Sequence, residues 1–301
     1  MSDKKIITVF CATGAQGGAV ARALSKDPDL HVRAVTRDVN TQKADKLKSL
    51  GVELVQCNTS NPASVRDALS GADGCFIVTH TDFGKQNSFE MEVHEGRQIA
   101  DACKAMRVGS VVFSTQRSSR VLGLQTRHMD AKAEIETYMH DLDLPLTCVM
   151  VPCYYEQFMG LFKPEKIDNN KYILEIPMGT TPMHLIALDD MGVVVRQIFN
   201  NWQTFIDKTI GICGDVLTIR DVAAILTQVL RPKTFADKPL TVNDYRNKKD
   251  FPGVSDWANL FTFRMRVDQI FNIHHTKMIH PQMKSFEEWA RENADTLHNV
   301  L

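Results

Sequence analysis

The chain of 301 residues is 44% apolar, which is enough to build one large globular domain or two smaller ones with a sizeable core. Its 35 basic and 36 acidic residues give a net charge of −1, so we expect no basic surface and no direct binding of nucleic acid. The chain starts without an apolar signal segment and contains no apolar run long enough to span a membrane. We therefore expect no membrane contact and a cytoplasmic location, with a nuclear pool left open.

The seven cysteines are scattered and never form a Cys-x-x-Cys pair. Most of them lie inside apolar runs, where cysteine behaves as a small core residue. This usage is typical of a reducing compartment.

The first predicted elements are a strand at residues 6–10 and a helix at residues 19–24, joined by a glycine-bearing loop. Such a loop presents helix N–H groups to an anion, and dinucleotide phosphates are the usual ligand. The motif expects glycine at three positions three residues apart, and here Gly14 and Gly17 follow Cys11. We expect Gly14 to admit the pyrophosphate, Gly17 to bring the helix close to the sheet, and Cys11 to keep strand geometry while weakening binding. A tight turn without a ligand is the alternative.

Beyond this loop, predicted strands and helices alternate at short intervals. The strands cover residues 31–36, 52–57, 74–78, 108–114 and 146–151, and the helices between them cover residues 41–50, 61–69, 89–106 and 129–140. Alternation of this kind predicts a mainly parallel sheet, because parallel strands need crossovers and the crossovers cover both faces. The predicted fold class is α/β, a Rossmann-type doubly wound sheet that binds nucleotide at the carboxyl ends of its strands.

The pattern is less regular beyond residue 152. Short strands at residues 172–176 and 209–213 alternate with helices at 189–200, at 218–230 and over about the last 15 residues, the last starting at a capping box of Ser285 and Glu288. We predict a dinucleotide-binding Rossmann domain in residues 1–152 and a smaller α/β lobe in residues 153–301, packed on the first with some exchange of chain. The aromatic cluster of residues 257–263 is expected in the core, with a dimer interface as the alternative.

The end of the second predicted strand bears on the choice of cofactor. NAD-binding proteins of this type carry an acidic residue there for the ribose 2′-hydroxyl, whereas this chain has Thr36 and Arg37. A guanidinium forms charge-assisted hydrogen bonds with phosphate, so Arg37 favours the 2′-phosphate of NADP. An ordinary surface charge is the alternative.

His128 and Lys132 have the spacing of the Tyr-x-x-x-Lys pair of short-chain dehydrogenases. In that chemistry the lysine holds the nicotinamide ribose and lowers the pKa of the tyrosine, which donates a proton as hydride arrives. Lys132 can still hold the ribose here, whereas a histidine beside a lysine tends to stay neutral and is a poor proton donor. Ser114 is the candidate for the catalytic serine, with a capping role as the alternative.

Residues 154–157 follow the sixth predicted strand and carry two tyrosines. These rings are expected either to flank the nicotinamide or a substrate, or to lie in the core. His274, His275 and His280 are close in sequence but lack a nearby cysteine or a helical i, i+4 pair, so no metal site is expected.

Several segments together resemble the NmrA-like family, an atypical branch of the short-chain dehydrogenase superfamily. They are the loop at residues 11–18, the strand end at 35–37, residues 76–79, the His128 and Lys132 pair, residues 152–156 and residues 251–261. The resemblance covers nearly the whole chain and is greatest to the animal branch of HSCARG-type redox sensors. It implies NADP(H) binding without efficient turnover and a homodimer whose association or partner changes with the NADPH/NADP ratio. The implied partners are regulatory proteins, such as GATA-type transcription factors for fungal relatives and argininosuccinate synthase for animal ones.

The resemblance also implies a set of cofactor contacts in the two halves of the chain. They are Cys11, Ala12, Thr13, Gly14, Ala15, Gln16 and Gly17 of the loop, then Arg37, Asn58, Thr59, Thr79, His80, Thr81, His94 and Lys132, and finally Tyr154, Tyr155, Glu156 and Gln157. Three positions depart from the family pattern: Cys11 replaces a glycine, residues 39–41 lack the family's further basic residues, and His94 replaces a lysine. Fewer cations near the 2′-phosphate predict weaker NADP(H) binding or relaxed selectivity against NAD(H).

Three functions remain open at this point. The first is an NADP(H)-sensing regulator without efficient dehydrogenase activity, because His128 stands in place of the catalytic tyrosine. The second is an NADPH-dependent quinone or enone reductase in which Lys132, His128 or water supplies the proton. The third is a scaffold without cofactor, which the cysteine at position 11 of the loop leaves open.

Overall fold

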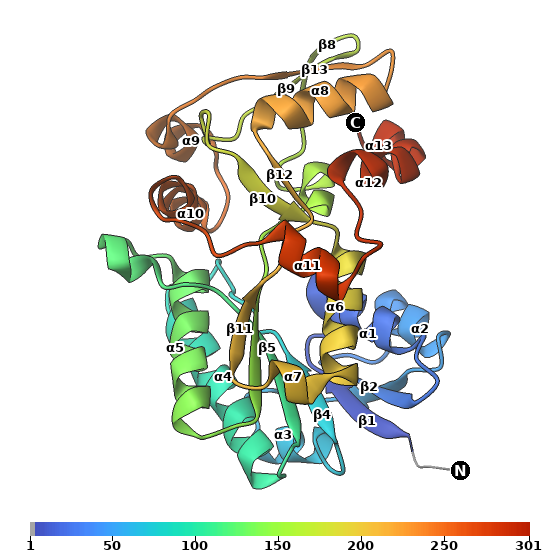
Figure 1. The fold of residues 1–301 in the computed structure, drawn as a ribbon. Helices are drawn as coiled ribbons and strands as arrows, with labels where there is room; N and C mark the ends of the chain where they lie inside the picture. The colour runs from blue at the N-terminus through green and yellow to red at the C-terminus, as the bar shows by residue number, and fades with distance from the viewer. Residues whose placement is uncertain (1–3) are drawn as a thin grey trace. The chain divides into compact units, whose positions relative to one another are not determined.

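The computed structural model describes residues 4–301, and a seven-stranded sheet forms the centre of its first compact unit (Figure 1). The strands are β1 (Lys5–Val9), β2 (Leu30–Thr36), β3 (Glu53–Gln56), β4 (Gly74–Ile77), β5 (Ser110–Thr115), β6 (Leu146–Met150) and β11 (Lys208–Gly211). Their order is β3-β2-β1-β4-β5-β6-β11, and every pair from β3 to β6 is parallel. This is the order of a Rossmann sheet, with the change of winding direction between β1 and β4. The predicted fold class is confirmed.

Helices cover both faces of this sheet (Figure 1). They are α1 (Ala15–Leu24), α2 (Gln42–Lys48), α3 (Pro62–Ala68), α4 (Ser88–Ala105), α5 (Arg127–Asp141), α6 (Leu188–Asn200) and α7 (Trp202–Phe205). Apolar side chains of α3, α4 and α5 form one core cluster with β4, β5 and β6. Strands β4 and β5 are buried along their whole length, which explains their nearly continuous apolar sequences.

The chain divides into two compact units, and each unit is built from three separate segments of the sequence. The first comprises residues up to Ser118, Arg127–Met150 and Met191–Ile210, and the second comprises Ser119–Thr126, Val151–Asp190 and Gly211–Leu301. Residues 191–210, which the sequence division places in the smaller lobe, belong to the first unit here. Strand β11 correspondingly extends the Rossmann sheet beside β6, so its expected place among the strands of the smaller lobe is wrong.

The second unit contains two small sheets and short helices. One sheet has the order β12 (Asp215–Leu217), β10 (Met183–Ile186) and β7 (Cys153–Tyr154), and the other has the order β13 (Thr234–Asp237), β9 (Lys171–Leu174) and β8 (Glu165–Asp168). The helices are α8 (Ile219–Val229), α9 (Val242–Lys248), α10 (Val254–Arg266), α11 (Ile273–Ile279), α12 (Phe286–Glu292) and α13 (Ala294–Val300), with short 3₁₀ turns at Ser119–Leu122 and Tyr155–Met159.

Two sequence predictions about the second unit concern α10 and α12. Leu260, Phe261 and Phe263 are buried in α10, which confirms the core position for these three residues. Trp257 of the same cluster is only partly buried. The capping box at Ser285 is present, since Ser285 Oγ accepts a hydrogen bond from the N–H of Glu288. The prediction of a single final helix is wrong, because this segment forms two helices, α12 and α13, separated at Asn293.

Six of the seven cysteines are buried and Cys11 is partly exposed, with all seven thiols free. This agrees with cysteines that serve as core residues. Within residues 4–301, no helix combines the length and the apolar character needed to cross a bilayer.

Candidate functional site

The loop between β1 and α1 is held by β2 and β4, the two strands that flank β1 in the sheet. The N–H of Phe10 donates to the carbonyl of Phe76 in β4 (2.9 Å), and the N–H of Ala12 donates to the carbonyl of Val35 in β2 (3.1 Å). Helix α1 then begins at Ala15, with Gly14 as its N-cap. The loop therefore lies at the carboxyl ends of the strands, where the first turn of a helix presents amide groups to an anion.

Gly17 brings α1 very close to this loop. A Cβ atom on Gly17 would lie 2.3 Å from the carbonyl oxygen of Cys11 and 2.7 Å from that of Phe10. A Cβ atom on Gly14 would lie 3.1 Å from the same Cys11 oxygen. Both obstacles are backbone atoms, so a side chain at Gly17 requires the loop to move, and glycine alone permits this packing.

Cys11 does not keep the strand geometry expected of it. Its φ angle is +51°, in the left-handed region that costs a side-chain-bearing residue roughly 1–2 kcal/mol. The expectation is wrong because the chain must already turn at this position to bring Gly14 under the helix, and the Gly14 N–H donates to the Cys11 carbonyl (2.9 Å). Burial and then the negative charge of Glu95 raise the pKa of the Cys11 thiol to about 11.

The end of β2 places Arg37 at the surface beside the loop. Its side chain is exposed, while Thr36 is buried, with its hydroxyl oxygen 3.4 Å from that of Thr13. The carboxylate of Asp38 accepts a hydrogen bond from the N–H of Asn40 (2.8 Å) and so stays in its own turn. Arg37 is therefore exposed at the strand end that borders the loop, and its contact with the 2′-phosphate of NADP stays a prediction.

Residues that follow β3 contact a carboxylate of α4. Thr59 donates to Oε2 of Glu95 (2.9 Å), and Ser60 donates to Oε1 of the same carboxylate (3.3 Å). The side-chain oxygen of Asn58 accepts from the N–H of Ser60 (3.0 Å). The side chain of Asn58 is exposed, whereas the Thr59 hydroxyl already has an acidic partner.

Lys132 forms a buried ion pair that the sequence does not predict. Its Nζ donates to Oε1 of Glu92 at 2.5 Å, and the two side chains are 10% and 0% exposed. Glu92 also accepts from the hydroxyl of Thr79 (2.6 Å) and from that of Thr81. These two threonines, both expected to contact cofactor, thus serve to satisfy a buried carboxylate, while His80 between them is exposed.

The other candidate residues of the first unit, His128, Ser114 and His94, differ in their exposure. The His128 ring lies edge-on to the Phe83 ring, with ring centres 5.6 Å apart. The guanidinium of Arg127 lies over the Phe83 ring. Ser114 is almost fully buried within β5. His94 is exposed on α4, with its Nε2 3.0 Å from Nε2 of Gln98. Ser114 is therefore in a core position, whereas His128 and His94 are at least partly exposed.

The predicted contacts at residues 154–157 all lie in the second unit. Tyr155 is fully buried, packs edge-to-face against Phe286 and donates its hydroxyl to the carbonyl of Lys284 (3.1 Å). The carboxylate of Glu156 accepts from the N–H of Leu188 (3.1 Å). Gln157 accepts from the N–H of Tyr154 (3.1 Å), so Tyr155, Glu156 and Gln157 each have a partner within this unit, and their cofactor role stays a prediction.

Electrostatics show which predicted residues converge in the first unit. The charges of Glu95, Lys132, Arg37 and Glu92 all act on the thiol of Cys11. The loop, the end of β2 and parts of α4 and α5 therefore lie near one another in the first unit. Glu92 and Glu95 are absent from the sequence-based site. Their i, i+3 spacing on a predicted helix, opposite a lysine, is the signal that was available.

Comparison with known proteins agrees with the observed fold. The NmrA-like family profile matches residues 3–290. An NmrA-like family domain-containing oxidoreductase of Penicillium ochrochloron, ptmS, is 34% identical over 86% of this chain and 83% of its own, and a Dictyostelium discoideum protein with this domain is 29% identical over 77% and 79%.

Solved structures show the same fold. NmrA, a negative transcriptional regulator, has been solved with NADP (TM-score 0.84) and with NAD (TM-score 0.85), each 20% identical over 99% of this chain and 98% of NmrA. The NADPH-dependent quinone oxidoreductase QOR2 of Escherichia coli is 17% identical, with a TM-score of 0.75 over 95% and 99% of the two chains. With a glycine loop, a Rossmann sheet and a family profile that spans nearly its whole length, the chain belongs to the NmrA-like family.

Proposed function

We propose that this protein binds NADP(H) as a redox-sensing regulator and lacks efficient dehydrogenase activity. One observation carries the proposal: the glycine loop leads directly into the first turn of α1, while Lys132 is held by the buried carboxylate of Glu92. The site thus keeps the features that bind a dinucleotide and alters those that turn it over.

The residues of the first unit fit a dinucleotide. Gly17 lets α1 pack directly on the backbone of the loop, and the first turn of α1 offers amide groups to the pyrophosphate. The exposed guanidinium of Arg37 would hold the 2′-phosphate of NADP. When bound, the nicotinamide ring of the cofactor supplies hydride chemistry.

Selectivity for NADP over NAD is expected to be modest. Arg37 is the cation at the end of β2, and the family's further basic residues are replaced by Val39, Asn40 and Thr41. The Glu95 carboxylate acts on the same loop and opposes an added phosphate. That NmrA itself has been solved with either NADP or NAD is consistent with this expectation.

Poor turnover follows from the surroundings of the two residues at the expected catalytic positions. His128 stands where a tyrosine would donate the proton, and its ring packs against Phe83. The ammonium of Lys132 is engaged by the carboxylate of Glu92, which makes it less available to hold a nicotinamide ribose. The pair also lacks the tyrosine hydroxyl that donates the proton in short-chain dehydrogenases.

The regulatory part of the proposal rests on the resemblance to HSCARG-type sensors. We propose a homodimer that binds regulatory proteins, in the cytoplasm with a nuclear pool left open. Calorimetric titration with NADPH, NADP and NADH tests cofactor binding, and gel filtration with and without NADPH tests the sensor role. We expect NADPH binding with less than about 10-fold preference over NADH and a change in association state or partner binding, and an unchanged elution profile together with unchanged partner binding would contradict sensing.

An NADPH-dependent oxidoreductase is the second candidate. The observation that favours it is that several curated relatives, including ptmS, are named oxidoreductases. Steady-state oxidation of NADPH with a panel of quinones and enones separates the two functions. Turnover that Lys132→Ala abolishes supports the enzyme, whereas NADPH binding without turnover supports the regulator.

A further inference from the structure

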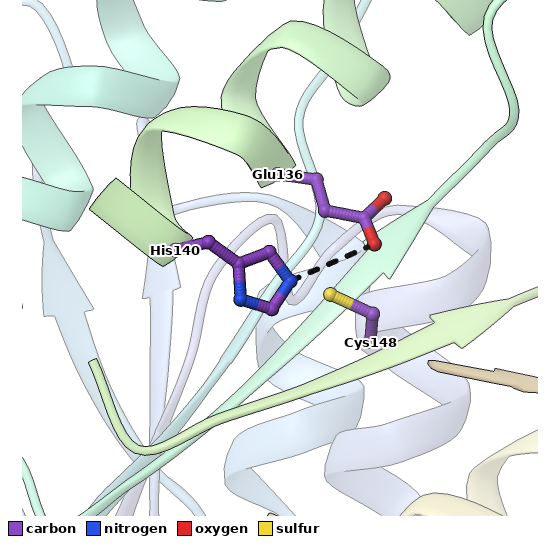
Figure 2. A group of neighbouring side chains, drawn as sticks. All are labelled: Glu136, His140 and Cys148. Carbon is purple, nitrogen blue, oxygen red and sulfur yellow. Dashed lines mark ion pairs between the residues drawn. The ribbon is translucent and has the colours of Figure 1, made fainter. Parts of the chain in front are cut away.

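A cluster of three different metal-ligating side chains lies in the first unit, apart from the residues that act on the loop. Glu136 and His140 share one face of α5, and Cys148 comes from β6 (Figure 2). Their ligating atoms all lie within 4.8 Å of one another. We propose that Glu136, His140 and Cys148 form a Zn²⁺ site with one open position.

The distances suit a small tetrahedral ion. Zinc bonds of about 2.0–2.3 Å place neighbouring ligand atoms roughly 3.3–3.8 Å apart in a tetrahedron. Oε1 of Glu136 and Nε2 of His140 are 4.0 Å apart, and the sulfur atom of Cys148 points toward both (Figure 2). Zinc binding would draw the three ligand atoms closer together, and His140 is the exposed one of the three side chains.

Two hydroxyl groups orient the Glu136 carboxylate. Thr115 of β5 donates to Oε2 (2.6 Å), and Thr209 of β11 donates to Oε1 (3.2 Å). In metal sites, hydrogen bonds from surrounding residues hold the ligand side chains in the orientation that binds the metal. Four elements of the first unit, β5, β6, β11 and α5, therefore converge on one carboxylate.

The ligand set is chemically matched to zinc. Sulfur, imidazole nitrogen and carboxylate oxygen are all common zinc ligands, and three protein ligands leave a position for water. Thiolate and carboxylate together balance the two charges of the ion. In the metal-free protein, burial and then the charge of Glu136 raise the pKa of the Cys148 thiol, so binding must release the thiol proton to solvent.

Two other histidine–carboxylate pairs lack a third potential metal ligand nearby within the described part of the chain. His31 lies 2.7 Å from Glu53, and His280 lies 3.0 Å from Asp190. Among residues 4–301, only the Glu136 group combines three potential ligands of this kind at such short separation. His31 therefore provides a control that has the histidine and the carboxylate but lacks the thiol.

Titration of the full-length, EDTA-treated protein with Zn²⁺ and with Co²⁺ tests the proposal. We expect one Zn²⁺ per chain, release of about one proton per ion at neutral pH, and a thiolate-to-Co²⁺ charge-transfer band. His140→Ala, an exposed change, should weaken Zn²⁺ binding by about 10-fold or more, and Cys148→Ser should remove the charge-transfer band. His31→Ala should leave both properties unchanged.

Three results would overturn the site. They are the absence of Zn²⁺ binding by the wild-type protein, wild-type affinity in the His140→Ala protein, and bound Co²⁺ without a thiolate band. Because His140 is exposed, its variant tests the site even if the buried Cys148 substitution does not fold.

Discussion

The ammonium of Lys132 in α5 lies 2.5 Å from the fully buried carboxylate of Glu92 in α4. The two residues are 40 positions apart in sequence. This pair ties together the helices α4 and α5, and it engages the lysine on which either proposed function depends. Glu92 is therefore a positioning residue for Lys132.

Removal of one partner should be costly. Glu92→Gln leaves the Lys132 ammonium buried without its counter-charge, and we expect the free energy of unfolding to fall by about 3–5 kcal/mol. The double variant Glu92→Gln with Lys132→Met should lose less than the sum of the single losses. Urea denaturation measures all three, and additive losses would contradict coupling.

The matched control lies on the same two helices. Arg97 of α4 and Glu134 of α5 form a partly exposed ion pair at 3.0 Å. Glu134→Gln should change the free energy of unfolding by less than about 1 kcal/mol, since water screens such pairs.

Cys11→Gly tests the strained position in the phosphate loop. Glycine removes roughly 1–2 kcal/mol of left-handed strain but costs about 0.5–1 kcal/mol in chain entropy, so we expect a stability gain of at most about 1.5 kcal/mol. NADPH should bind more tightly, because the turn then reaches the phosphate-binding geometry without strain. Cys11→Ala keeps a Cβ atom and should show neither gain in thermal denaturation and NADPH titration. Equal NADPH affinity in all three proteins would indicate that Cys11 does not limit binding.

Arg37→Ala tests the cation at the end of β2. Loss of a charged hydrogen bond of about 1.5–3 kcal/mol should weaken NADPH binding by about 10-fold or more while NADH binding changes little. Lys43→Ala, another cation close in sequence, should have a much smaller effect. Equal losses for both cofactors after the Arg37 change would place the guanidinium away from the 2′-phosphate.

Glu175 should make stability depend on pH. Burial works to raise its pKa, but hydrogen bonds from Lys248, Lys249 and Lys238 outweigh it and lower the pKa to about 2. Because the folded-state pKa is below the unfolded one, the stabilisation is present above pH 4.5 and is lost as the pH falls toward 2. Glu175→Gln should therefore lose about 2–3 kcal/mol at pH 7 and match the wild-type protein near pH 2.

The control for this prediction shares one of the same lysines. Exposed Glu165 lies 3.4 Å from Nζ of Lys248, and Glu165→Gln should have little effect at any pH. A wild-type stability that does not fall relative to Glu175→Gln between pH 4.5 and pH 2 would contradict the assignment.

Sequence patterns alone were sufficient for the Rossmann sheet and for the positions of Gly14, Gly17 and Arg37. Buried strands, amphipathic helices and glycine turns are set by neighbouring residues, so they can be read from local periodicity. The same reasoning placed β11 in the wrong sheet and extended the final helix past Asn293. A short strand carries no local mark of its partner, and the end of a short helix depends on packing.

Tertiary structure decided the chemistry of the site. The φ angle of Cys11 follows from the close contact between α1 and the loop, and the neutralisation of Lys132 follows from the packing of α4 on α5. The group of Glu136, His140 and Cys148 arises because the fold places α5 beside β6. Each depends on groups that approach only after the parallel crossovers have formed, so local sequence determined the elements and the packing between them determined the charges and ligands.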